Sequence, residues 1–502
     1  MRKKIIAFVL AALLIGWGVM LVLQKRTTHQ APAAPVKTAE PAASGSGSAA
    51  ASGSAAAPGS AGAPVGSAPA TASGSASGAA DAGAPKLMDR PLRVVALGWD
   101  LAAPGILANG GAEPSPTSEM SAAGLDMRIS VAQGASTLEA ALARGGEDKD
   151  GADVAILPLP TFVAAYERLR ALSLDMFFVV GWSRGREAVA SSKPEWPSKG
   201  DVKLAGAAGD PATFLALWAF DLGGVGPGQV KIAAPGAPAS DAPYAGVDRS
   251  TPLPADSSRS ALLLTTADAP RLIPYVAVAP RGLIEQRSRA LTAWATGWLA
   301  GARKLSQDAT AGARAVGATK GAPEPITLLQ TLGQSAPATL ADNVRAAGLS
   351  GRGAITLETL FQRTWAIWRA ASVLATPSPE TAPVSTGIIS AIARAEPAQA
   401  AAADEAKPRE APAGAKVLIT YRQPDAKVDE AALVSTAGLL AGVFERAPLR
   451  LGVNAAGSID KNRTKKVIDD ALGRFGLVPG RITAATKAVP LSTASIEVLS
   501  VP

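Results

Sequence analysis

Hydrophobic residues in the first three quarters of the chain form short runs of two alternating kinds. Runs typical of buried strands occupy 92–98, 125–133, 152–160 and 175–183, and amphipathic helices are predicted between them at 136–145 and 161–173. A second series of strand, turn and helix at 201–225 precedes two strands at 260–270 and 273–280 and helices at 282–305, 326–334 and 357–374. This alternation predicts the α/β class, with a mostly parallel sheet and helices on both faces.

Two segments interrupt the pattern. Residues 31–90 and 376–415 consist mainly of Ala, Gly, Ser and Pro with few branched or aromatic side chains. Such segments have too little apolar surface to offset the loss of chain entropy on folding, so we expect two disordered linkers. They leave two folded blocks, 91–375 and 416–502.

The N-terminal residues 1–30 have the pattern of a membrane segment. An apolar run, Ile5 to Leu23, lies between the basic stretches "RKK" and "KR". Its length is near the ~20 residues that a helix needs to cross a bilayer. The absence of a small-residue cleavage site close behind it favours an uncleaved signal anchor over a cleaved signal peptide. We expect a single-pass transmembrane helix in the inner membrane, with the bulk of the chain in the periplasm.

The near absence of cysteine and histidine excludes several kinds of catalytic and metal site. The chain has no cysteine and one histidine, His29, which lies just past the apolar run. Disulfides, thiolate metal sites, cysteine nucleophiles and Ser-His-Asp triads are therefore excluded. We expect no catalytic residues, no metal, no cofactor and no enzymatic activity. The net charge of +8 is scattered along the chain, so nucleic acid is not an expected partner.

Candidate ligand-binding residues follow from the strand ends. In α/β sheets, ligands bind beyond the carboxyl ends of strands, where loops lead into helices. "GWD", "PLPT", "GWSRG", "GDPAT" and "TTAD" stand at such positions. The candidates are Trp99, Asp100, Pro160, Thr161, Trp182, Ser183, Arg184, Gly209, Asp210, Thr213, Thr265 and Asp268.

Two alternatives stay open among these candidates. Trp99 is either a flat wall of the site or a packing residue. Asp100, Asp210 and Asp268 either cap helices, as aspartate prefers, or contact an amine on the ligand. Asp210, followed by proline at the first helical position, is suited to capping.

The order of these motifs resembles a known family. "GWDLAAPGILA", "AGLDMRISVAQGASTLEAALARGGEDKDGADVAILPLPTFVAA", "VVGWSRGREAVAS" and "AAGDPATFLALWAFDLGGVGPGQVKI" stand in the order seen in periplasmic solute-binding proteins of the nitrate/sulfonate/taurine type, the receptors of ABC importers. The resemblance covers 91–375. It implies a two-lobed periplasmic-binding-protein fold (type II-like), with crossovers near 180–184 and 273–278 and a small-molecule ligand clamped between the lobes. The implied ligand is a small anion, bound by the amides at a helix N-terminus and by Arg184.

The second block resembles the OmpA-like domains that attach envelope proteins to peptidoglycan. "NRTKKVIDDALGRFGLVPGRI" carries this resemblance, and Arg463 falls on the family's peptide-binding arginine. The family's aspartate partner is replaced by Ala455, so the resemblance implies a small, degenerate α/β OmpA-like domain at 416–502 with doubtful peptidoglycan binding.

Two functions follow as hypotheses. The first is a membrane-anchored periplasmic solute receptor working with an ABC transporter permease. The alternative is a cell-envelope tether, held by its OmpA-like tail, that binds no small molecule.

Overall fold

The structure, a computed structural model, describes residues 84–198, 200–250, 258–350, 353, 355–401, 414–423, 427–455, 458–490 and 492–500. The predicted membrane helix and nearly all of the first linker lie outside these residues. No helix within the described ranges is both long and apolar enough to cross a membrane.

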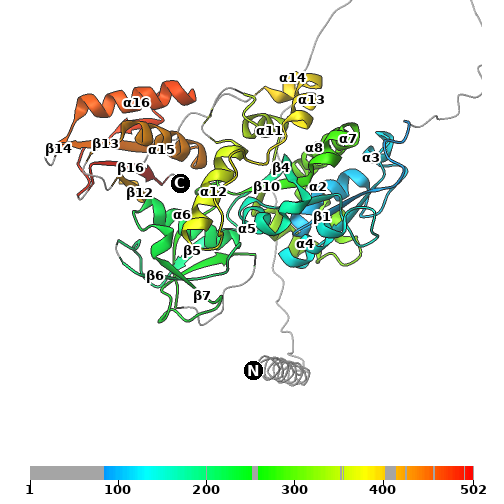
Figure 1. Ribbon diagram of the computed structural model, residues 1–502, viewed down its shortest axis with the longest axis horizontal. Coiled ribbons are helices and arrows are strands. Elements are labelled where there is room, and N and C mark those ends of the chain that lie inside the picture. The colour runs from blue at the N-terminus through cyan, green and yellow to red at the C-terminus, as the bar shows by residue number, and fades with distance from the viewer. Residues whose placement is uncertain are drawn as a thin grey trace, which may run out of the picture. The chain divides into compact units, whose positions relative to one another are not determined.

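The first lobe is built on a six-stranded sheet with the strand order β11-β4-β10-β3-β1-β2. Its strands are β1 (Leu92–Ala96), β2 (Met127–Val131), β3 (Val154–Pro158), β4 (Leu174–Ser183), β10 (Pro274–Pro280) and β11 (Ser335–Pro337). β1 pairs in parallel with β2 and β3, whereas β10 runs antiparallel between β3 and β4. The sheet is therefore mixed rather than mostly parallel, because β10 returns from the second lobe and inserts between two strands of the first (Figure 1).

Helices cover this sheet. They are α2 (Trp99–Asn109), α3 (Glu119–Ala122), α4 (Ala135–Arg144), α5 (Leu159–Leu169), η1 (Arg170–Leu172), α7 (Arg281–Gln286), α8 (Ser288–Gln307), α9 (Ala309–Gly317), α10 (Pro325–Leu332) and α11 (Leu340–Ala346). The long helix α8 packs directly on α2. Two glycines permit this close approach: a Cβ on Gly301 would lie 1.9 Å from the carbonyl oxygen of Pro104, and one on Gly105 would lie 2.2 Å from the Trp298 ring.

The second lobe has a five-stranded sheet with the order β7-β6-β8-β5-β9. Its elements are β5 (Glu187–Ser191), β6 (Val202–Ala205), β7 (Val230–Ala233), β8 (Tyr244–Asp248), β9 (Ala261–Thr265), α6 (Pro211–Leu222), η2 (Pro227–Gln229) and α12 (Leu357–Ala370). Helix α6 is apolar almost all round and fully buried apart from its ends, which is the pattern of a helix packed on several sides. Helix α12 packs against both α5 and α6, so it contacts the two lobes together (Figure 1).

The chain crosses between the lobes twice. The first crossover follows β4 at 184–186, and the second joins β9 to β10 at 266–273. The two α/β lobes joined by two crossovers, which the resemblance implied, are confirmed. The range expected for the first crossover, 180–184, belongs to β4 except for its last residue. The range expected for the second, 273–278, belongs to β10 except for its first residue.

The described part of the second predicted linker, 376–401, differs from expectation. It forms α13 (Gly387–Ala395) and α14 (Pro397–Ala400), and α13 packs on α8 and α11. Ile388, Ile389 and Ile392 are buried on one face of α13 and supply the apolar surface that the Pro-rich flanking composition concealed.

The C-terminal block, 416–502, is a separate sheet covered by two helices. Its elements are β12 (Val417–Gln423), α15 (Glu430–Val443), β13 (Leu449–Ala455), β14 (Ser458–Ile459), α16 (Lys461–Phe475), β15 (Ile482–Ala484) and β16 (Ala494–Leu499). The strand order is β12-β16-β13, with β14 and β15 both paired to β13. The block has the expected small α/β make-up, whereas its OmpA-like character and its status as a domain stay predictions.

Candidate functional site: a cavity between the two lobes

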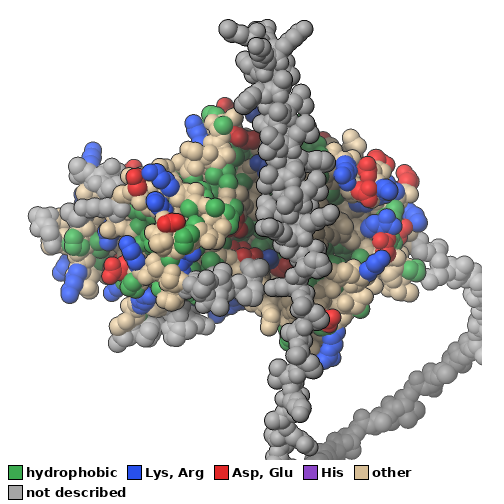
Figure 2. Space-filling view, turned by 90° about the horizontal axis from the view of Figure 1, so that it is seen from below, with side chains coloured by type: hydrophobic (Ala, Val, Ile, Leu, Met, Phe, Trp, Pro, Cys, Tyr) green, Lys and Arg blue, Asp and Glu red, His purple; other side chains and the backbone are tan. Residues whose placement is uncertain are grey.

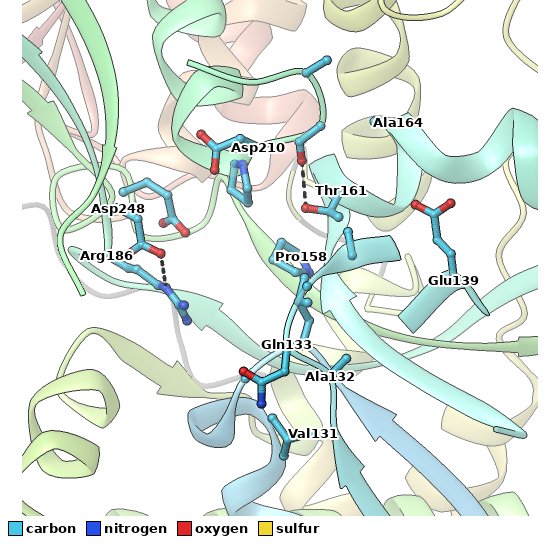
Figure 3. A pocket seen from close by; sticks show the side chains of 18 of the residues that line it. Val131, Ala132, Gln133, Glu139, Pro158, Thr161, Ala164, Arg186, Asp210 and Asp248 are labelled. Carbon is cyan, nitrogen blue, oxygen red and sulfur yellow. Dashed lines mark hydrogen bonds and ion pairs between the residues drawn. The ribbon is translucent and has the colours of Figure 1, made fainter. Parts of the chain in front are cut away.

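A cavity of about 570 Å³ opens where the loops of both lobes meet (Figure 3). Its walls come from the carboxyl ends of β1, β2, β3 and β6, from the first crossover, and from the end of β8. The lining residues are Leu97, Gly98, Trp99, Val131, Ala132, Gln133, Gly134, Ala135, Glu139, Pro158, Thr161, Ala164, Arg168, Arg186, Glu187, Ala208, Gly209, Asp210, Pro211, Asp248 and Val373. The position agrees with the rule that ligands bind beyond the carboxyl ends of strands.

Glycines shape two of the turns that form the walls. Gly98 has φ 139°, between the end of β1 and the first residue of α2, and Gly209 has φ 81° just before α6. Side-chain-bearing residues rarely adopt this backbone region, so glycine lets the chain turn sharply at both places. The first turn places Trp99 at the start of α2, and the second places Asp210 at the N-cap of α6.

Arg186, in the first crossover, connects the two lobes electrostatically. Its Nη1 donates to Oδ2 of Asp100, in the first lobe, at 3.0 Å. Its Nε donates to Oδ2 of Asp248, in the second lobe, at 3.2 Å (Figure 3). Burial alone would lower the pKa of Arg186, but the two carboxylates raise it above its ordinary value. Burial raises the pKa of Asp100 despite the opposing effect of Arg186. The arginine is therefore a permanent cation held by one carboxylate from each lobe.

Glu187 links the two crossovers by hydrogen bonds. Its side chain is only 3% exposed, accepts a short hydrogen bond from the Ser183 hydroxyl, and lies 3.2 Å from the hydroxyl of Thr266. The hydroxyls of Ser183 and Thr266 are 2.8 Å apart. Burial raises the pKa of Glu187 to about 7, and the hydrogen bond from Ser183 limits the rise. The result is a carboxyl group that changes its charge near neutral pH, at the point where both crossovers meet.

Two further contacts define the rest of the cavity. The Thr161 hydroxyl, on α5, donates to the carbonyl oxygen of Gly209 at 2.9 Å and so joins the lobes directly (Figure 3). Asp210 accepts from the amide of Thr213 at 2.9 Å and from its hydroxyl at 3.0 Å. Burial raises the pKa of Asp210, whereas these hydrogen bonds lower it. The capping interpretation of Asp210 is confirmed.

On the opposite side of the cavity, Glu139 and Arg168 form an ion pair between α4 and α5. Nε and Nη2 of Arg168 donate to the two carboxylate oxygens of Glu139 at 3.0 and 2.7 Å. This two-point geometry fixes both side chains at the rim.

The sequence candidates fall into three groups. Trp99, Thr161, Gly209 and Asp210 line the cavity. Residues that lie behind the lining and bond to a lining residue are Asp100, Ser183 and Thr213. Candidates outside the lining are Pro160, Trp182, Arg184, Thr265 and Asp268.

Each residue of the third group has another role or position. The carbonyl oxygen of Pro160 accepts from the Trp368 indole, and Trp182 is buried beneath the guanidinium of Arg271. Arg184 is exposed to solvent. The side chain of Asp268 accepts from the amide and hydroxyl of Thr265, both at 2.9 Å, and closes the turn after β9.

Sequence reasoning missed the charged centre of the site. Arg186 and Glu187 lie one and two residues beyond the "GWSRG" motif, and Asp248 ends β8, a strand that the hydrophobic pattern did not indicate. Gln133 ends the strand predicted at 125–133, so the carboxyl-end rule could have found it. No local signal shows that Arg186 and Asp248 pair, because they meet only after the lobe has folded.

In the C-terminal block, Arg463 is already paired. Its Nε and Nη2 lie 2.9 and 2.8 Å from Oε1 of Glu430, on α15. Hydrogen bonds from Arg463 and Lys466 lower the pKa of Glu430. Ala455, at the end of β13, supplies no carboxylate, so the acid that Arg463 contacts comes from this domain's own first helix.

Elsewhere on the molecule, positive and negative side chains are interspersed over the visible face (Figure 2). Within the described ranges, no group of three or more His, Cys, Asp and Glu residues is placed to hold a metal ion.

No protein-family model matches the chain, and no curated protein matches it. Among solved structures, it is similar to a periplasmic sulfonate-binding protein, SsuA, of Methylobacillus flagellatus, with 12% identity and a TM-score of 0.42 over 61% of this chain and 94% of the other. It is also similar to the ligand-binding component of an ABC-type import system of Staphylococcus aureus with zinc bound, with 11% identity and a TM-score of 0.40 over 60% and 98%. The alkanesulfonate-binding protein SsuA of Xanthomonas axonopodis, bound to MOPS, has 16% identity and a TM-score of 0.38 over 57% and 94%. These TM-scores are low, and the functional proposal rests on the cavity itself.

Proposed function

We propose that residues 91–375 form a solute receptor that binds one small molecule between its two lobes. The observation that supports this proposal is the interlobe cavity, whose lining comes from both lobes and from the first crossover. Its volume of about 570 Å³ falls within the roughly 300–1,000 Å³ typical of small-molecule sites.

The contacts around the cavity are consistent with a hinge movement that opens and closes the two lobes. Thr161 contacts Gly209 across the cleft, and Arg186 contacts a carboxylate of each lobe. Movement about the two crossovers would break these polar contacts and shift the packing of α12 on α5 and α6, while leaving each sheet intact. Hinge movement of this kind, about a few residues between rigid lobes, is a common response to ligand binding.

The sequence resemblance supplies the cellular part of the proposal. We propose that the receptor is anchored in the inner membrane by residues 1–30, faces the periplasm, and delivers its solute to an ABC transporter permease. No enzymatic step is part of the proposal, because Asp100, Glu187 and Asp210 hold Arg186, Ser183 and Thr213 in place.

A thermal-shift screen of the full-length protein tests the receptor proposal. The panel contains small anions (nitrate, bicarbonate, ethanesulfonate) and small amines (choline, putrescine, lysine, taurine). A solute at 100 times its Kd adds about 2.7 kcal/mol to the free energy of unfolding, which raises the melting temperature by a measurable amount.

A pair of matched variants localises any effect. Ala208→Trp places an indole in the cavity wall, whereas Ala234→Trp adds the same group at an exposed position outside it. We expect the shift to disappear in Ala208→Trp and to persist in Ala234→Trp. If no solute of either class shifts a well-folded protein, the receptor proposal fails and the envelope tether becomes the better account.

A further inference from the structure

Acidic side chains outnumber basic ones around the cavity. The described lining contains four carboxylates, Glu139, Glu187, Asp210 and Asp248, and two guanidinium groups, Arg168 and Arg186. Asp100 adds a fifth carboxylate directly behind Arg186.

Both arginines are already engaged. Arg168 is held by the two oxygens of Glu139, and Arg186 is held between Asp100 and Asp248. An anionic ligand would therefore have to compete with carboxylates that are part of the protein. Such a ligand would also bring a further negative charge into a site that holds an excess of them, which raises its energy.

Two carboxylates of the described lining lack a direct ion pair, although Arg186 favours the charged form of Glu187 from beyond ion-pair distance. Within the described part of the chain, neither Asp210 nor Glu187 has a basic group within ion-pair distance, although both line the cavity. Their hydrogen-bond partners are the amide and hydroxyl of Thr213 for Asp210, and the hydroxyls of Ser183 and Thr266 for Glu187. A positively charged group of a ligand in the cavity would offset the negative charge of these two carboxylates.

Neither the helix N-terminus nor the arginine expected to bind an anion is available to a ligand in this cavity. The N-terminus of α6 is capped by Asp210, so a carboxylate of the protein occupies the place where a ligand anion would sit. Arg184 lies outside the lining and is exposed. Trp99 lines the cavity, and the face of an indole ring attracts ammonium groups.

We propose that the cavity binds its solute through an ammonium group, which takes its place beside Asp210 and Glu187 with Trp99 as an aromatic wall. This inference rests on the proposed receptor function and adds the chemical class of the ligand. Amines and zwitterions with an accessible ammonium group belong to this class.

Affinity should consequently depend on pH. The charged and titratable groups that interact with Glu187 are Arg186, Asp248 and Tyr275, and its hydrogen-bond partners Ser183 and Thr266 carry no charge. Because the pKa of Glu187 is about 7, this carboxyl group must lose its proton to bind a cation at lower pH. Affinity for an ammonium solute should therefore fall about tenfold from pH 8 to pH 6, whereas affinity for an anion should rise.

Isothermal titration of the full-length protein with matched solutes tests the inference. The first member of each pair carries one or more ammonium groups that the second lacks: choline and 3,3-dimethyl-1-butanol, putrescine and 1,4-butanediol, norleucine and hexanoate, taurine and ethanesulfonate. We expect at least one pair in which the ammonium member binds and its counterpart does not bind or binds at least tenfold more weakly.

Variants then assign the effect to the cavity. Asp210→Asn removes the charge but retains a good helix cap, and should weaken binding of the ammonium solute about tenfold. Glu187→Gln should remove the pH dependence between pH 6 and 8. Asp241→Asn, at an exposed position of the second lobe outside the lining, should leave both unchanged.

The outcomes separate the two proposals. Binding confined to nitrate, bicarbonate or ethanesulfonate, or equal affinity within every pair, overturns the ammonium inference and leaves the receptor standing. An ammonium solute whose affinity is unaffected by Asp210→Asn and by pH also overturns it. A protein that binds none of these solutes contradicts both.

Discussion

Glu187→Gln should stabilise the protein at alkaline pH and have almost no effect at acidic pH. Glu187 is buried, and its pKa rises from 4.5 to about 7 on folding because the charged form loses its hydration. Between these two pH values the folded protein holds a proton that the unfolded chain has released. Raising the pH across this window therefore lowers the free energy of unfolding, by about 3 kcal/mol in total.

Glutamine retains the shape of the protonated side chain and cannot ionise. The free energy of unfolding of Glu187→Gln should accordingly exceed that of the unmodified protein by about 3 kcal/mol at pH 8, and the difference should shrink below about 1 kcal/mol at pH 4.5. The two hydroxyls beside it, on Ser183 and Thr266, can still bond to the amide.

Urea denaturation followed by tryptophan fluorescence measures this difference at both pH values. The C-terminal block, 416–502, contains no tryptophan, so every tryptophan of the described chain belongs to 91–375. Glu285→Gln, at an exposed position of α7, is the control and should shift neither midpoint. An equal advantage of Glu187→Gln at both pH values would refute the claim that a buried, ionising Glu187 lies between the crossovers.

Two other predictions concern the packing and pairing that hold the lobes in shape. Arg186→Gln leaves the buried carboxylate of Asp100 without its cation, so it should lower the free energy of unfolding by about 3–5 kcal/mol. The same urea denaturation measures this loss. A loss below about 1 kcal/mol would contradict the ion pair between Arg186 and Asp100. Gly301→Ala places a methyl group 1.9 Å from the carbonyl oxygen of Pro104 and should destabilise the protein by about 1–3 kcal/mol. Gly473→Ala, on an exposed face of α16 with open space around it, should instead stabilise the C-terminal block by about 0.5–1 kcal/mol. Circular dichroism melting measures both variants. A change in melting temperature of the same sign for both would contradict this contrast.

Much of the fold is predictable from local sequence patterns. The strand and helix alternation from 92 to 183 predicts β1 to β4 and the helices α4 and α5, because each element carries its own hydrophobic pattern. The antiparallel position of β10 is not predictable in this way, since its neighbours β3 and β4 are far from it in the sequence. Helix α13 could have been found from its isoleucine stripe, but the surrounding Pro- and Ala-rich composition outweighed that signal.

The candidate site likewise has some residues that local sequence rules find and others that only the folded structure shows. The rule that ligands bind beyond the carboxyl ends of strands finds Trp99, Thr161, Gly209 and Asp210. Each of these residues lies between the end of a strand and the first turn of the next helix. The rule does not find how charges combine across the cavity. Arg186 obtains its partners from α2 and β8, and only their meeting shows that the site carries more negative than positive charge.

The claim that both lobes bind the same solute is tested most directly by the distance between them. The natural chain has no cysteine, so Lys149→Cys in the first lobe and Lys203→Cys in the second, both exposed positions, create two unique sites for spin labels. Pulsed electron paramagnetic resonance then measures the interlobe distance with and without the solute identified by thermal shift. We predict a narrower distribution centred at a shorter distance when the solute is bound; an unchanged distribution at saturating solute would contradict closure of the lobes on a shared ligand.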